Sequence, residues 1–127
     1  MPTLIESDIV FAEFRENLRV DLEVAKTIVS DRLVLTINKM HYVIFDVSNV
    51  KEITIEAKEF MQQPDHGLKN ILGAAFLATN PMATLIAKIF VKTQKDFQAK
   101  FFSTREDAFE WILSYREKTN SENSTRI

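Results

Sequence analysis

Short apolar runs alternate with helix-like segments along most of this 127-residue chain, and this alternation constrains the fold more than any other feature of the sequence. Residues 41–47 read HYVIFDV and residues 71–78 read ILGAAFLA, each an almost unbroken apolar run. A run of this kind is typical of a strand that is covered on both faces of its sheet. Each run is followed by a segment that opens with a helix-capping residue, so strands and helices succeed one another.

Helix start signals lie between the apolar runs. Asp21 precedes apolar residues that recur at helical spacing up to about residue 34, and Thr54 precedes a second such segment. Asn80 and Pro81 open a third helix, because proline suits the first helical position. Thr104 opens a fourth. The remaining predicted elements are strands at residues 9–14 and 99–102 and a short partner strand at 3–6.

This order of elements predicts an α/β fold, with a mixed, largely parallel sheet of four to five strands and about four helices. Residues 1–117 are expected to form a single domain of ordinary size. The segment 118–127 reads KTNSENSTRI, which is polar and carries no core pattern. We therefore expect a disordered polar tail there.

Composition and charge exclude several classes of function. The net charge of −2 supplies no field that would attract nucleic acid, so no nucleic-acid partner is expected. Residues 71–91 are apolar overall, but they contain Asn80, Pro81 and Lys88, which argue against a membrane span. The chain has no cysteine, which excludes disulfides and thiolate chemistry and fits a cytoplasmic location.

The segment DVSNVKEITIEA, residues 46–57, resembles the switch loop of the STAS superfamily, the fold of bacterial anti-sigma-factor antagonists. The likeness rests on Asp46 after an apolar strand, then on Ser48, Val50 and Ile53, and on Thr54 at a helix start. The closing stretch FFSTREDAFEWI also resembles the usual ending of the STAS and SEC14-like group. The resemblance spans residues 8–116 and implies a regulatory or lipid-carrying domain of bacterial origin.

The residue that would make this loop a phosphorylation switch is replaced. In STAS antagonists the loop reads D-x-S-x-V-x-x-x-D-S-S-G, and the last serine accepts a phosphate. Here Glu56 stands at that position and Ala57 replaces the glycine. Glu56 either stabilises a helix start or holds a fixed charge that mimics a phosphate in part. Thr54 and Ser48 remain modifiable, although a capping threonine and a loop-turning serine explain both.

No constellation of residues in the sequence supports catalysis. The chain has two histidines, His41 and His66, too few for the usual metal patterns, so no metal site or cofactor is expected. It has two glycines, which excludes a glycine-rich phosphate loop, and no G-x-S-x-G elbow for a nucleophilic serine. We therefore expect a protein that is not an enzyme.

The predicted helix at 81–93, PMATLIAKIFVKT, is more apolar than a helix on an open sheet requires. Its apolar side chains cover an arc of about 240°, where a stripe of about 100° is usual. We place Met82 and its neighbours toward the sheet and expect the surplus surface at Ala83, Ala87, Phe90 and Val91 to meet a second subunit or an apolar ligand. The alternative is that the last helix covers this surface within one chain.

Two functions follow from these observations. The first is a non-catalytic regulatory or interaction module with a STAS-like fold, forming a homodimer and binding a regulatory protein partner. The alternative is a carrier or sensor of a small apolar ligand or lipid, as the SEC14-like resemblance implies. The site candidates are Asp46, Ser48, Thr54 and Glu56 in the loop and the four helix residues Ala83, Ala87, Phe90 and Val91.

Overall fold

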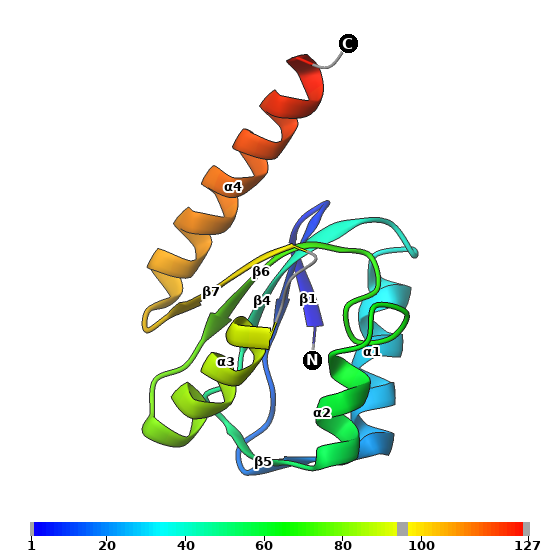
Figure 1. Ribbon diagram of the computed structural model, residues 1–127, viewed down its shortest axis with the longest axis vertical. Helices are drawn as coiled ribbons and strands as arrows, with labels where there is room; N and C mark the ends of the chain where they lie inside the picture. Colours follow the sequence, from blue (N-terminus) through cyan, green and yellow to red (C-terminus); the bar gives the residue numbers. More distant parts are fainter. Residues whose placement is uncertain (1, 94–96, 126–127) are drawn as a thin grey trace.

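Five strands form the main sheet of the computed structural model, which describes residues 2–93 and 97–125 (Figure 1). The strand order is β1-β2-β4-β6-β7, and only the β1–β2 pair is antiparallel. The predicted mixed, largely parallel sheet is therefore confirmed. The strands of this sheet are β1 (Pro2–Glu6), β2 (Ile9–Ala12), β4 (His41–Asp46), β6 (Ile71–Leu77) and β7 (Gln98–Phe102).

Three helices cover one face of the sheet and a fourth covers the other. The crossover helices are α1 (Leu22–Leu35), α2 (Ile55–Met61) and α3 (Pro81–Thr93), and the last helix is α4 (Arg105–Thr125). Because β2, β4, β6 and β7 are added in one direction, crossovers of one hand place all three connecting helices on the same face. Only the helix after the last strand is then left to cover the opposite face.

The side chains of the core separate into the same two layers. One buried cluster joins alternate strand residues such as Val43 and Phe45 to α1, α2 and α3. The other joins the intervening strand residues, including Tyr42 and Ile44, to Ile112 of α4. The alternative in which the last helix covers α3 is therefore wrong, because α4 packs on the far face of the sheet (Figure 1).

Helix α4 is held against the sheet by a close approach and by ion pairs. A Cβ atom on Gly73 would lie 2.6 Å from Cε1 of Tyr115, so glycine is needed where this ring meets β6. Arg116 Nη1 donates to Glu6 at 2.8 Å and to Asp8 at 2.9 Å, which ties the helix to the β1–β2 hairpin.

Helix α4 also continues to Thr125, into the segment for which the sequence predicts a disordered tail. The structure thus differs from the prediction for residues 118–125, and residues 126–127 lie outside the described part. The physical reason is that helical backbone hydrogen bonds are made within the segment and need no buried face. No glycine or proline follows Pro81, so nothing in the sequence breaks the helix.

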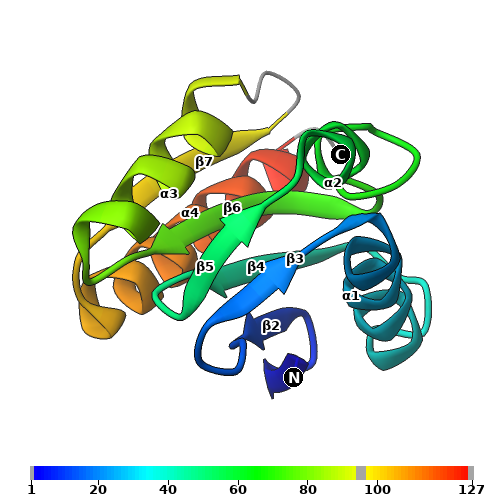
Figure 2. The same cartoon turned by 90° about the horizontal axis from the view of Figure 1, so that it is seen from below.

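A second, two-stranded sheet was not predicted. Strand β3 (Leu18–Val20) pairs in parallel with β5 (Val50–Ile53), and the two lie side by side in Figure 2. Val50 to Ile53 falls in the segment that the resemblance describes as a loop, so part of that loop is a strand. Each strand is too short to carry a periodic pattern, and each finds its partner some thirty residues away.

Candidate functional site

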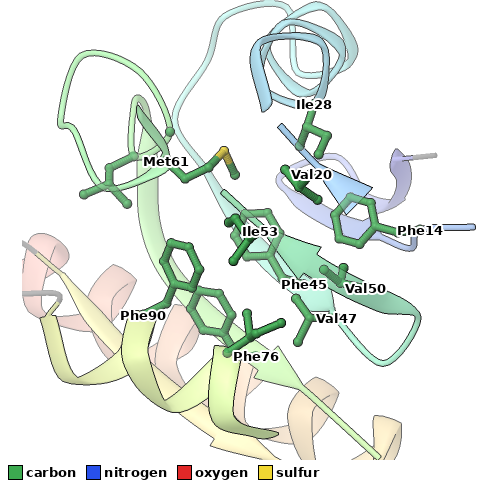
Figure 3. Close-up of a pocket in the computed structure, with 13 residues that line it drawn as sticks. Phe14, Val20, Ile28, Phe45, Val47, Val50, Ile53, Met61, Phe76 and Phe90 are labelled. Atoms are coloured by element: carbon green, nitrogen blue, oxygen red, sulfur yellow. The ribbon is translucent and has the colours of Figure 1, made fainter. Parts of the chain in front are cut away.

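An apolar cavity of about 60 Å³ lies between the main sheet and the helices α1, α2 and α3 (Figure 3). It also lies against the β3–β5 ribbon, whose inward residues Val20, Val50 and Ile53 reach it. Every side chain in its lining is apolar, and Gly67 contributes backbone alone. The lining residues that the structure describes are Phe14, Val20, Ile28, Phe45, Val47, Val50, Ile53, Met61, Gly67, Leu68, Phe76, Ile86 and Phe90.

A ladder of three aromatic rings forms the cavity's rigid side. The rings of Phe45 and Phe76 stack with centroids 5.3 Å apart, and those of Phe76 and Phe90 stack at 5.7 Å. Neighbouring parallel strands supply the first two, since Phe45 and Phe76 are register partners in β4 and β6. Helix α3 supplies the third ring. Stacking of this kind holds the side chains in place and keeps the space beside them open.

The segment 46–57 supplies the opposite wall of the cavity. Val47, Val50 and Ile53 point their side chains into it, and Met61 of the following helix does the same (Figure 3). The site candidates predicted in this segment were its polar residues, and its apolar residues were not predicted to form a site. The spacing of Val47, Val50 and Ile53 was the available signal, but it becomes informative only once β5 is seen to cover the core.

The polar loop candidates fall into two separate pairs, one before β5 and one after it. Asp46 accepts a hydrogen bond from the backbone N–H of Ser48 at 3.0 Å, which forms the turn after β4. Ser48 Oγ accepts from the N–H of Thr79 at 3.2 Å, and its carbonyl accepts from the Asn80 side chain at 2.6 Å. This first pair therefore joins two loops at the carboxyl ends of β4 and β6.

The second pair lies at the start of α2. Thr54 Oγ1 accepts from the N–H of Ala57 at 3.2 Å, so the predicted helix cap is confirmed. Glu56 is exposed in the first turn of the same helix, where a negative charge is favourable. The structure does not bring Glu56 together with Asp46 or Ser48, because the four residues of β5 separate them.

The sequence of the chain matches the model of one protein family. The model of the family described as domain of unknown function DUF7793 matches residues 3–116, most of the chain. The chain belongs to the DUF7793 family. No curated protein matches it in sequence.

A solved structure resembles the DUF7793 chain in fold. It is the crystal structure of an uncharacterized protein of the DUF3478 family from Shewanella loihica PV-4, described as having a SpoIIAA-like fold. The TM-score is 0.60 at 14% sequence identity, and the match covers 88% of this chain and 90% of that one. The expected STAS-like architecture is confirmed by this similarity, which at so low an identity concerns the fold alone.

The helix residues proposed as an interface do not lie where the sequence placed them. Ala83 and Ala87 are fully buried against the sheet, so neither can meet a second subunit. The reason is complementary size, because the bulky ring of Phe76 fills the layer beneath α3 and small side chains let the helix approach. Phe90 and Val91 are partly buried in the same cluster, and Phe90 lines the cavity.

The outer face of α3 carries the apolar residues that the prediction had turned inward. Met82 is 55% exposed, Leu85 is 59% exposed and Ile89 is 37% exposed. The surplus apolar surface therefore exists, but it lies on the other side of the helix. Within residues 2–93 and 97–125, no three histidine, aspartate or glutamate side chains are grouped to hold a metal ion. No helix in this described part is long and apolar enough to cross a membrane.

His41 is a fully buried titratable group at the start of β4. Its Nδ1 lies 2.8 Å from the carbonyl oxygen of Lys39, so Nδ1 carries the proton and donates it. Burial lowers the pKa of His41 below its ordinary value of 6.5, and the charge of nearby Arg32 lowers this pKa further. In the folded DUF7793 protein this imidazole is therefore neutral at pH 7.

The buried imidazole predicts a dependence of stability on pH. As the pH falls below 6.5, His41 becomes protonated in the unfolded chain but stays neutral in the folded chain until its lowered pKa is reached. The free energy of unfolding therefore falls as the pH falls through the folded pKa. The contribution is complete above pH 6.5. Urea unfolding followed between pH 7.5 and 5 measures it, and His41→Gln is expected to flatten this slope. An unchanged slope in His41→Gln would contradict the assignment.

Proposed function

We propose that this DUF7793 protein is a non-catalytic STAS-like module that binds a small apolar ligand as a carrier or sensor. The observation that carries this proposal is the cavity lined throughout by apolar side chains and walled on one side by β5 and α2. An apolar space beside packed aromatic rings favours an apolar guest, since water would gain few hydrogen bonds there.

The proposed absence of catalysis is supported by what the polar loop residues already do. Asp46, Ser48 and Thr54 each accept a backbone hydrogen bond that forms a turn, a loop contact or a helix cap. The two histidines lie in different environments, since His41 is buried and His66 is exposed in the loop after α2. Glu56 replaces the phospho-acceptor, so we propose that a ligand takes the place of phosphate as the signal.

The position of the cavity supports sensing as well as carriage. A guest would press on Val50 and Ile53, and these residues belong to the ribbon that leads directly to the capped start of α2. Displacement of the ribbon would move Thr54 and Glu56 on the surface. The absence of cysteine also supports a cytoplasmic setting for this module.

Titration with toluene, followed by two-dimensional NMR of methyl groups, tests the proposal. Binding is expected to shift the methyl signals of Ile53, Met61 and Ile86, which line the cavity, and to leave that of exposed Leu85 unchanged. Val47→Leu places an extra methylene in the cavity and is expected to weaken toluene binding. Failure of saturating toluene to shift any lining residue would overturn the proposal.

A second candidate function is favoured by the outer face of α3. Met82, Leu85 and Ile89 form an exposed apolar surface, and such surfaces commonly meet a protein. We propose that a second copy of the chain or a regulatory protein docks there. The two proposals are compatible, because the cavity lies under the inner side of the same helix.

A further inference from the structure

Arg32 of α1 is a buried cation whose hydrogen bonds are mostly unmade. It is 1% exposed, and its Nη2 donates a hydrogen bond to the carbonyl oxygen of Lys69 at 3.1 Å. Nε and Nη1 have no partner among the described residues. A guanidinium has five N–H donors, and a buried donor without an acceptor costs free energy.

The charge of Arg32 is also uncompensated. Burial lowers its pKa from 12.5 to about 10, so the guanidinium still carries its charge at pH 7. No carboxylate in the described part of the chain forms an ion pair with it, and the nearby imidazole of His41 is neutral. Buried charges in folded proteins are usually paired. An anion is the kind of partner that would compensate this charge.

A second cavity of about 60 Å³ opens onto Arg32. Phe14, Ile28 and Phe45 line both this cavity and the apolar one, so these three side chains form a wall that the two spaces share. Phe14 and Ile28 are only partly buried, which leaves their side chains room to rotate. A change of rotamer at Phe14 or Ile28 would join the two cavities into one space, with Arg32 at one end and apolar side chains at the other. The other residues that line the second cavity are Pro2, Ala12, Asp31 and Arg32.

We propose that the ligand of this protein is a small monocarboxylic acid with a short hydrocarbon chain. Its carboxylate accepts hydrogen bonds from the unpartnered nitrogens of Arg32, and its chain passes Phe14 and Ile28 into the apolar cavity. This inference rests on the proposed function and adds the chemical class of the ligand. A neutral hydrocarbon would fill the apolar space but would leave the buried charge unpaired.

The test compares hexanoate with 1-hexanol, which has a chain of the same length and no charge. Calorimetric titration at pH 7 is expected to show hexanoate binding about tenfold more tightly than 1-hexanol. Arg32→Met is expected to remove this preference and to leave the affinity for 1-hexanol unchanged. Lys69→Met serves as the matched control, because it removes an exposed charge near Arg32 but keeps the backbone carbonyl that Arg32 contacts.

The remaining outcomes separate this inference from the function on which it rests. Equal affinities for hexanoate and 1-hexanol in the wild type would overturn the carboxylate site and leave apolar binding intact. Acetate binding as tightly as hexanoate would also overturn it, since the site would then take an anion alone. Failure of both 1-hexanol and toluene to bind would overturn the proposed function itself. Thermal unfolding of each variant confirms that a loss of binding is not a loss of fold.

Discussion

Arg32→Met is expected to raise the free energy of unfolding of the ligand-free protein by about 2 kcal/mol. Methionine fills a similar volume and carries no charge into the interior, whereas the guanidinium loses its hydration there and recovers one hydrogen bond. Loss of that bond to Lys69 offsets part of the gain. Urea denaturation at pH 7 measures the change.

Arg15→Met is the control for this prediction. Arg15 is exposed, so removing its charge is expected to change the free energy of unfolding by less than about 0.5 kcal/mol. A decrease in stability on Arg32→Met would show that the guanidinium is a structural support, and the argument for an anionic ligand would lose its basis. An increase would mean that the fold tolerates a destabilising charge at a position where a ligand can use it.

Ile86→Ala is expected to lower the free energy of unfolding by about 3 kcal/mol. Ile86 is 8% exposed and packs between α3 and the sheet, where it lines the apolar cavity. Its truncation removes buried methyl groups and enlarges a space that the surrounding rings cannot close. Chemical denaturation of the purified protein at low micromolar concentration gives the value.

The adjacent residue provides the matched comparison. Leu85 is 59% exposed, so Leu85→Ala is expected to change monomer stability by less than about 0.5 kcal/mol. Comparable losses for the two variants would contradict the orientation of α3.

If α3 forms the proposed homodimer face, Leu85→Glu is expected to convert a dimer to a monomer in light scattering. A wild-type monomer at 100 µM would overturn the dimer.

Local signals in the sequence were sufficient for most of the fold. Unbroken apolar runs identified the central strands, and the predicted caps at Asp21, Thr54 and Thr104 each accept the expected backbone hydrogen bond. The β3–β5 ribbon was missed because its pairing is non-local and each strand is only three or four residues long. The orientation of α3 was missed because it depends on the size of Phe76 on the sheet beneath it.

The candidate site was less accessible from sequence than the fold. The resemblance of residues 46–57 to a STAS switch loop made Ser48 and Glu56 site candidates. In the structure Ser48 joins two loops before β5, and Glu56 lies in the first turn of the helix after it. Arg32 lies in a helix whose pattern is read as having a polar side, and a lone arginine there is ordinarily a surface residue. Its burial depends on the loop around Lys69, which is adjacent only in the folded chain.

The order of the strands has a consequence for how the protein is made. In the main sheet each strand lies beside the one that precedes it in that sheet, so a strand leaving the ribosome finds its neighbour already synthesised. Strand β3 is the exception, because it must wait for β5 about thirty residues later. The sheet therefore grows at a single edge while β1 stays at the other edge, and α4, translated last, covers the apolar face that the three crossover helices leave exposed.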